Sequence, residues 1–262
     1  SVGRFGAVEL GLMKKVRSGA RLNLIDRKMA WVNAGIWPPT NVTIDTFSTL
    51  YAEAIASCDA LAIWPENLLE GQADLLNELA PGAVQFPLGA LDPVLLQSLN
   101  EDNEVWSRKL IGKRVLVVHS MNESIAKQHP LLTLVHPDGL IPEFELAYIQ
   151  PPETNGLTFW RPKFTVQLDL FEKLLDETVG DFQPEIALVA AGGYGMPILK
   201  SLRDRGISAI YVGGALQLFF GIMGHRWRSR SEVVCRVNDS WLDAPLESPP
   251  FGFKLIEKGT YW

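Results

Sequence analysis

A cluster of glycines follows one apolar run of the sequence and could hold an anionic ligand. The run Ile186–Ala190 is too short for a helix, and Gly192, Gly193, Tyr194 and Gly195 come directly after it. Between a strand and a helix, a loop of this kind leaves backbone N–H groups open to a phosphate. The spacing is not the dinucleotide fingerprint, and no P-loop lysine follows. A tight turn that binds nothing explains the glycines equally well.

A polar loop follows a second apolar run, which ends at His119. Ser120, Asn122 and Glu123 come next, and they offer hydroxyl, amide and carboxylate groups to a ligand. Two ordinary explanations stand beside that one. Ser120 or Asn122 is an N-cap of the following helix, and the ring of His119 is satisfied by the backbone within the core.

Arg4 and Glu9 form a third group, in the segment RFGAVEL near the start. Glu9 falls in the first turn of a helix expected from Ala7, where the helix dipole favours a carboxylate. Arg4 is suited to neutralise a diphosphate, and a surface ion pair explains it as well. The motif RWRSR at 226–230 is the densest basic patch, and it fits an anionic ligand or a solvated loop equally.

The order of apolar and polar segments predicts the scaffold that must bring these groups together. Residues 186–212 indicate a strand, a glycine loop, a helix and a second strand, which is a βαβ unit with parallel strands. The apolar stretch 214–222 is expected to be helical, with Gly214 at its start and Gln217 within it as further ligand-binding candidates. Asp92, with proline next, predicts another helix start in which Asp is the N-cap.

Further strands are expected at 2–5, 60–64, 114–119 and 144–149, with helices between them that include 66–80. Alternating strands and helices predict an α/β protein, Rossmann-like, with a mainly parallel sheet flanked by helices. Residues 1–262 show no internal repeat and no linker, so we expect one domain, with 235–262 as an extended tail that packs over the sheet. Ligands bind at the carboxyl ends of parallel strands, so the loops 119–124 and 191–195 should meet.

Composition disfavours several classes of protein. The 262 residues are 47% hydrophobic and carry a net charge of −6, without a basic cluster interleaved with aromatic residues, which disfavours a nucleic-acid binder. No apolar run reaches about 18 residues, so we expect no membrane span, and no signal peptide is visible. Two cysteines form no metal or disulfide framework, so we expect a reduced, cytoplasmic setting. Zinc-protease, serine-hydrolase and P-loop motifs are absent.

Four segments together resemble a largely uncharacterised bacterial family that is often encoded near surface-polysaccharide genes. They are RFGAVEL, NAGIWP at 33–38, KRVLVVHSMNESIAKQ at 113–128, and AGGYGMPI with YVGGALQLFFGIMGHRW within 191–227. The resemblance covers nearly the whole chain. That family is similar to the GT-D-fold glycosyltransferases, which have a Rossmann-like core, use nucleotide sugars, and bind donor and metal through an Asp-x-Glu motif near the N-terminus.

The resemblance implies a nucleotide-sugar donor, a glycan or lipid-linked acceptor, and Mn²⁺ or Mg²⁺ as a cofactor. Glu9 matches the Glu of the motif, which implies a catalytic or metal-binding role, but Ala7 stands where the motif has Asp. A single carboxylate holds such a cation poorly, so metal dependence stays open. Glu9 would then act as a base or bind a sugar hydroxyl.

Three functions follow as hypotheses. The first is a glycosyltransferase that moves a sugar from a nucleotide sugar to a glycan or a similar acceptor. The second is a non-catalytic nucleotide- or glycan-binding protein on the same scaffold, which Ala7 favours. A transferase that uses S-adenosylmethionine is a third, but the run Ala209–Val212 passes into glycine without the acidic residue usual at that strand end.

Overall fold

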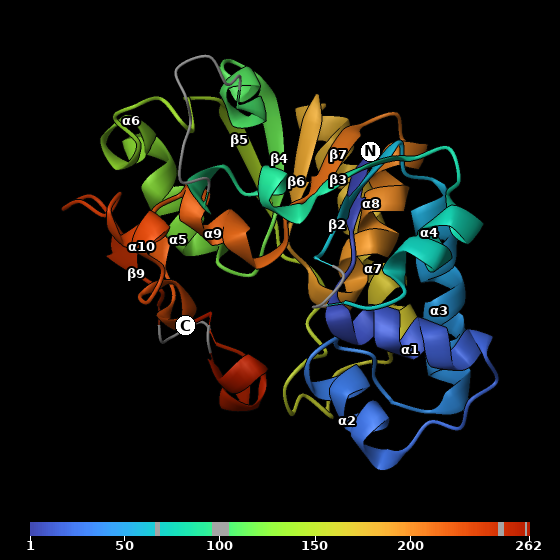
Figure 1. Cartoon of the computed structure of the whole chain (residues 1–262). Helices are drawn as coiled ribbons and strands as arrows, with labels where there is room; N and C mark the ends of the chain where they lie inside the picture. Colours follow the sequence, from blue (N-terminus) through green and yellow to red (C-terminus); the bar gives the residue numbers. More distant parts are fainter. Residues whose placement is uncertain (66–68, 96–104, 246–248, 260) are drawn as a thin grey trace.

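A seven-stranded parallel sheet forms the centre of the computed structural model (Figure 1). The structure describes residues 1–65, 69–95, 105–245, 249–259 and 261–262. Side by side, the strands are β3 (Val84–Pro87), β2 (Ala60–Ile63), β1 (Val2–Arg4), β7 (Ser208–Tyr211), β6 (Ile186–Val189), β4 (Arg114–Val118) and β5 (Glu145–Ile149). The sheet and its flanking helices confirm the α/β, Rossmann-like prediction.

Strand β4 illustrates how the sequence specifies this sheet. Its side chains alternate between two cores, with Leu116 and Val118 in one and Val115 and Val117 in the other. All four are fully buried. Because parallel strands are covered on both faces, they read as continuous apolar runs in the sequence, and this made β4 and β6 predictable.

Two sets of helices cover the sheet, one on each face (Figure 1). One core includes side chains of α1 (Ala7–Arg17), α3 (Asn41–Ala56), α4 (Gln72–Leu79), α7 (Phe164–Phe182) and α8 (Gly195–Asp204). The other includes those of α5 (Asn122–Gln128), α6 (Leu132–Val135), α9 (Leu216–Phe219) and α10 (Ser231–Val234). The sheet is therefore buried on both faces, and a ligand can reach it only at an edge.

The strand order reverses between β6 and β4. From β4 the chain passes outward to β5, whereas from β6 it passes the other way to β7. At such a switch point the two following loops diverge above and below the sheet, which opens a crevice at the carboxyl ends of the strands. The chain that leaves β4 begins at His119, and the chain that leaves β6 begins at Ala190, whose N–H donates to Val118 O (2.9 Å).

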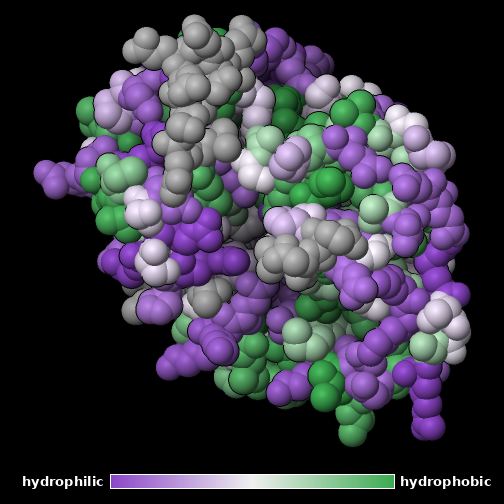
Figure 2. All heavy atoms as spheres, in the orientation of Figure 1, coloured by the Kyte–Doolittle hydropathy of each residue, from purple (hydrophilic) through white to green (hydrophobic). Residues whose placement is uncertain are grey.

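The C-terminal part returns to this same edge of the sheet. A small parallel pair, β8 (Ile222–Met223) and β9 (Leu242–Asp243), follows α9, and hydrophilic side chains gather over α10 and β9 (Figure 2). Residues 249–259 then fold in short 3₁₀ turns, and Trp262 O accepts the N–H of His225 (3.3 Å). The described part of the expected tail thus has little regular structure beyond these short turns and β9, and it packs at this edge of the sheet.

Several other local predictions need correction. After Asp92 the described residues form a 3₁₀ turn, Pro93–Leu95, and residues 96–104 of the expected helix lie outside the described residues. The helix expected over 214–222 is the four-residue α9 after a 3₁₀ turn. The helix expected over 66–80 is α4, which begins at Gln72, and residues 66–68 lie outside the described residues.

Strand β3 and helix α2 are among the elements that were not predicted from the sequence. Strand β3 lies at the edge of the sheet, and its Val84 is 65% exposed, so no buried apolar run announces it. Helix α2 (Leu24–Val32) packs on α1 and starts with a capping box between Asn23 and Asp26. That signal is present in the sequence, but a single apolar stripe does not accompany it.

Candidate functional site

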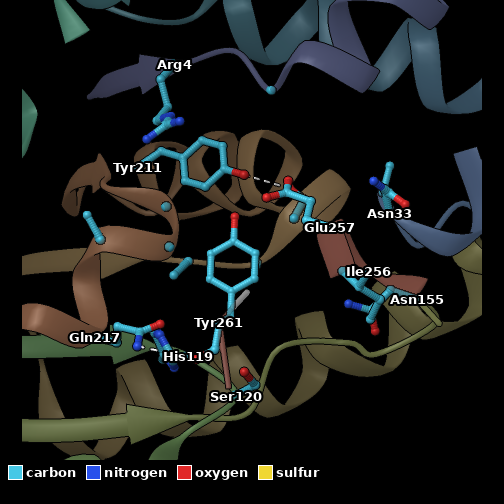
Figure 3. Close-up of a pocket in the computed structure, with 18 of the residues that line it drawn as sticks. Arg4, Asn33, His119, Ser120, Asn155, Tyr211, Gln217, Ile256, Glu257 and Tyr261 are labelled. Atoms are coloured by element: carbon cyan, nitrogen blue, oxygen red, sulfur yellow. Dashed lines mark hydrogen bonds between the residues drawn. The ribbon is translucent and has the colours of Figure 1, made fainter. Parts of the chain in front are cut away.

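The carboxyl ends of all seven strands line one cavity of about 540 Å³. Taken in sheet order from β3 to β5, each strand end contributes at least one residue: Leu88, Trp64, Arg4, Gly213, Ala190, His119 and Pro151. The C-terminal segment supplies a further wall, with Pro250, Glu257, Tyr261 and Trp262. Segments from the two ends of the chain therefore meet at a single site (Figure 3).

Most of the site residues predicted from the sequence line this cavity. They are Arg4, Glu9, His119, Ser120, Gly192, Tyr194, Gly214 and Gln217. Four others do not, namely Asn122, Glu123, Gly193 and Gly195. The two predicted loops do meet, but only part of each loop faces the cavity.

Asn122 and Glu123 lie at the start of α5, outside the cavity. With its amide oriented to suit both neighbours, the side chain of Asn122 donates to His119 O (2.7 Å) and accepts from Gln150 N–H (3.0 Å). Glu123 is exposed in the first turn of the helix. Asn122 therefore joins the ends of β4 and β5, and Glu123 has the ordinary place of a carboxylate near a helix N-terminus.

The N–H groups of the glycine loop are committed within the protein. Gly193 N–H donates to Ala34 O (3.1 Å), Tyr194 N–H to Ala191 O (3.0 Å), and Gly195 N–H to Gly192 O. A Cβ on Gly193 would lie 2.4 Å from Ala34 O, and a Cβ on Gly195 would lie 2.3 Å from the Tyr211 ring. Close packing accounts for both glycines, and these three donors are not free for a phosphate.

The second pair of glycines makes room for side chains of other elements. Gly213 has a left-handed backbone (φ 76°) and lies against the guanidinium of Arg4. A Cβ on Gly214 would lie 2.1 Å from the ring of Tyr261. The buried amide of Gln217 donates to Ile222 O (3.0 Å) and Tyr261 O (3.4 Å). This segment therefore holds Arg4 on one side and the C-terminal residues on the other.

Arg4 is held in the cavity wall by neutral groups. Its Nη1 donates to Val212 O (3.0 Å), and its guanidinium lies over the ring of Trp64 at 5.4 Å from the centroid. The indole of Trp64 is itself fixed, because Nε1 donates to Phe5 O (2.9 Å). No carboxylate is paired with Arg4 among the described residues, so its positive charge is available to an anion.

Arg226 faces the same cavity from the C-terminal side. Its guanidinium lies over two rings, 4.9 Å from the centroid of Trp227 and 4.8 Å from that of Tyr261. Nη1 also forms an ion pair with Glu257 Oε2 at 3.3 Å. The basic motif RWRSR signalled this residue in the sequence. Its partners Glu257 and Tyr261 carried no such signal, because they come from the end of the chain.

Glu9 is buried at the N-terminus of α1, with its carboxylate folded back against Gly6. Burial raises the pKa of Glu9, and the charge of Glu257 raises it further. A hydrogen bond from its own backbone N–H and the charge of Arg4 act in the opposite direction. Glu9 thus combines a position in the cavity wall with the helix-terminal role that the sequence also allowed.

Asp92 is a second buried carboxylate in the cavity wall, and sequence reasoning assigned it only as an N-cap. It is 7% exposed, and its Oδ1 has no hydrogen-bond partner among the described residues. Burial raises the pKa of Asp92 to about 6, while the charges of Arg4, Arg226 and Arg230 lower it. A carboxylate that is buried without a hydrogen bond is costly, which makes this residue a strong functional candidate.

His119 also lines the cavity, with one ring nitrogen already satisfied. Nδ1 accepts the backbone N–H of Met121 (2.9 Å), and burial lowers the pKa of His119 to about 4. The imidazole is therefore neutral at pH 7, with its proton on Nε2. The backbone contact expected for a core histidine is present, yet the ring still borders the cavity.

Unpartnered polar atoms gather in this one cavity. Of seven buried side-chain atoms without a partner among the described residues, four belong to residues of the cavity wall: Asp92 Oδ1, Asn155 Oδ1, Trp227 Nε1 and Trp262 Nε1. Buried polar atoms in native proteins nearly always have partners. Their concentration here indicates a polar ligand with both hydrogen-bond donors and acceptors.

The donor set does not fit a divalent cation. Ala7 provides no ligand beside Glu9, and within the described ranges no three His, Cys, Asp or Glu side chains are grouped closely enough to hold a metal ion. Hard cations such as Mn²⁺ and Mg²⁺ need several oxygen ligands. The described residues of the cavity therefore do not form a site for Mn²⁺ or Mg²⁺.

Comparison with known proteins gives no match, whether to a family model, to a curated protein or to a solved structure. None of the helices in the described part of the chain is at once long and apolar enough to cross a membrane.

Proposed function

We propose that the protein is a glycosyltransferase that binds a nucleotide sugar in the cavity at the carboxyl ends of the strands. The observation that carries this proposal is that Arg4 and Arg226 converge on one cavity that also contains two buried carboxylates, Glu9 and Asp92. Guanidinium groups suit a diphosphate, and carboxylates suit the hydroxyl groups of a sugar.

The tryptophans of the wall support the same class of ligand. Trp64 lies beside Arg4 and Trp227 beside Arg226, so an aromatic surface adjoins each cation. Aromatic faces stack on nucleobases, and each stacked base contributes about 1–3 kcal/mol. A nucleotide sugar has a nucleobase at one end, a diphosphate in the middle and a sugar at the other end. The tryptophans, arginines and carboxylates of the cavity suit these three parts in turn.

In the proposed reaction, the diphosphate lies between Arg4 and Arg226, and the sugar lies near Glu9. The acceptor oxygen attacks the anomeric carbon, while the bond from that carbon to the diphosphate oxygen breaks. Negative charge then develops on the leaving diphosphate, where the two guanidinium groups stabilise it. Glu9 orients a hydroxyl group of the sugar. The neutral imidazole of His119 donates a hydrogen bond from Nε2 to the bound nucleotide sugar.

A non-catalytic nucleotide- or glycan-binding protein is the second candidate, and one observation favours it. Ala7 stands in place of the Asp on which donor and metal binding depend in the enzymes that the sequence resembles. Such a protein would bind the same ligands in the same cavity without turnover, and Glu9→Gln would change its affinity little.

Calorimetric titration with UDP-, GDP-, CMP- and dTDP-sugars, each with and without Mn²⁺, tests the proposal. We expect one nucleotide class to bind, and its sugar to be transferred or hydrolysed. Binding should be lost in the double variant Arg4→Met, Arg226→Met and kept in Arg17→Met, whose arginine pairs with Glu78 on the surface. Failure of every nucleotide sugar to bind would overturn the proposal, and binding without turnover would favour the second candidate.

A further inference from the structure

Asp92 lies between two short turns that cross the carboxyl edge of the sheet. It follows the 3₁₀ turn Leu88–Leu91 after β3 and precedes the 3₁₀ turn Pro93–Leu95. Its side chain faces the cavity with those of Leu88 and Leu95, and it is 93% buried, because only 7% of it is exposed. The carboxyl is thus buried in the wall of the cavity.

The turns do not need this side chain. The backbone N–H of Asp92 donates to Gly89 O (3.2 Å), and its carbonyl accepts the N–H of Leu95 (2.9 Å), so the main chain closes both turns. The side-chain Oδ1 has no hydrogen-bond partner in the part of the chain that the structure describes. A residue such as Asn or Leu would satisfy the local structure at a lower cost of burial, and a structural role therefore does not explain an aspartate here.

Three arginines act on Asp92 from three different segments. Arg4 ends β1, Arg226 lies in the turn His225–Trp227, and Arg230 precedes α10. Each is bound elsewhere, Arg4 to Val212 O, Arg226 to Glu257 and Arg230 to Glu232. They favour the ionised carboxylate through space while leaving Oδ1 free to accept a proton.

Glu9, the other buried carboxylate, differs in this respect. Its carboxylate is engaged by its own backbone N–H at the start of α1. Such a hydrogen bond stabilises the charged form and weakens the group as a proton acceptor. Between the two, Asp92 is the one whose oxygen is unoccupied.

We propose that Asp92 is the general base of the transfer reaction and accepts the proton of the acceptor hydroxyl. This assignment rests on the proposed function. As the acceptor oxygen bonds to the anomeric carbon, its proton passes to Oδ1 of Asp92. The bond from the anomeric carbon to the diphosphate oxygen breaks, and its electron pair leaves with the diphosphate. Asp92 ends the step as a neutral acid and returns the proton to solvent.

The acceptor for this step is an uncharged hydroxyl, which must be desolvated next to Asp92. Leu88 and Leu95, which flank Asp92 in the chain, are apolar and line the same cavity. General base catalysis of this kind typically contributes about 10²–10⁴-fold to the rate, and it is most effective when the pKa of the base lies near the working pH. Burial places the pKa of Asp92 at about 6.

The test compares Asp92→Asn and Asp92→Ala with the wild type, using Asp204→Asn as the control, since Asp204 pairs with Lys200 on the surface. The nucleotide sugar that binds best is the probe. We expect Asp92→Asn to bind the donor at least as tightly as the wild type, because the substitution removes a negative charge near Arg4 and Arg226, and to lose at least about 100-fold in kcat. The wild-type profile of kcat against pH should fall below about pH 6, and this acid limb should be absent from the residual activity of Asp92→Asn.

The outcomes separate this assignment from the proposed function. If the wild type turns over a nucleotide sugar and Asp92→Asn keeps its kcat or its acid limb, Asp92 is not the base, while the function stands. If the wild type binds but never turns over, both the enzyme proposal and the assignment fall. A measurement without ligand guards against misfolding: Asp92→Asn should have a higher melting temperature than the wild type at pH 7.5 and not at pH 4. Loss of the folded state in both variants at both pH values would show a structural role and overturn the assignment.

Discussion

Arg4 and Arg226 face one cavity, but they are held by opposite means. Arg4 is fixed by a carbonyl oxygen and an indole ring, so its charge is not compensated by a carboxylate among the described residues. Arg226 is fixed by the carboxylate of Glu257 and by two rings. The difference indicates that Arg4 is ready for an anion, whereas Arg226 must exchange an internal anion for an external one.

The segments that carry the two arginines differ in the same way. Arg4 belongs to the central strand β1, between β2 and β7. Glu257, the partner of Arg226, has a left-handed backbone (φ 44°), as does Lys258 (φ 61°), and only one other non-glycine residue described does so. Left-handed residues cost about 1–3 kcal/mol each unless their surroundings enforce them. The contacts of Glu257 with Arg226 are therefore part of what keeps this turn in place.

The largest effect is expected from Arg4→Met. The substitution keeps the aliphatic stem on Trp64 and removes the charge, so the affinity for the nucleotide diphosphate should fall about 100-fold, since hydrogen bonds to charged groups contribute about 1.5–3 kcal/mol. Calorimetry measures the loss, with Arg17→Met as the control. A change smaller than about threefold would show that Arg4 is not the principal anion site and would remove the contrast with Arg226.

A change of pH should act on both arginines through Asp92. Protonation of Asp92 removes the negative charge near both cations, so a nucleotide diphosphate should bind more tightly as the pH falls from about 7.5 to about 5, by roughly tenfold. Binding at about pH 6.5 should also take up protons, which calorimetry detects in buffers of different ionisation enthalpy. Affinity that is independent of pH between these values would exclude Asp92 from the electrostatics of the site.

The same carboxyl sets a pH dependence of stability. Burial raises the pKa of Asp92 from 3.8 to about 6, which corresponds to about 3 kcal/mol. Because the folded value lies above the unfolded one, the stabilising contribution of Asp92 is fully present below about pH 4 and is lost as the pH rises through about 6. Removal of the charge at neutral pH is therefore expected to stabilise the fold. This is why Asp92→Asn should have a higher melting temperature than the wild type at pH 7.5.

The smallest effect is expected from Glu257→Gln. The ion pair with Arg226 is partly exposed, and such pairs contribute about 0.2–1 kcal/mol, so release of Arg226 should tighten binding of the nucleotide diphosphate about threefold. Asp243→Asn is a matched control, because it releases Arg228 from a surface ion pair outside the cavity. Weaker binding in Glu257→Gln would mean that Glu257 supports the site, and the two arginines would then differ less than their contacts suggest.

The sequence predicted the parts of the molecule that depend on local pattern. The apolar runs of β4 and β6 announced buried parallel strands, and the rule for carboxyl ends placed His119 and Gly192 at one cavity. The edge strand β3 was not predicted, because its Val84 is exposed and the strand therefore lacks a run of buried apolar residues. The pattern of apolar residues along the chain reflects burial. It therefore predicts the most buried helices and strands best.

The site itself was only partly predictable, because its decisive contacts join distant parts of the chain. The N–H of Gly193 is taken up by Ala34 O, and the space above Gly214 is filled by Tyr261. From the local sequence alone, both glycines were candidates for ligand binding. Their partners, Ala34 and Tyr261, lie far from them in the sequence. Asp92 was not predicted as a site residue for a related reason. An aspartate before a proline has the same local sequence whether it caps a helix or lines a cavity.

The tryptophans of the cavity wall have a practical consequence. Of the eight tryptophans in the chain, three line the cavity: Trp64, Trp227 and Trp262. The indole nitrogens of two of them have no partner in the described structure. A ligand that stacks on these rings or bonds to these nitrogens would alter their intrinsic fluorescence, so the protein carries its own optical reporter for screening ligands without a label.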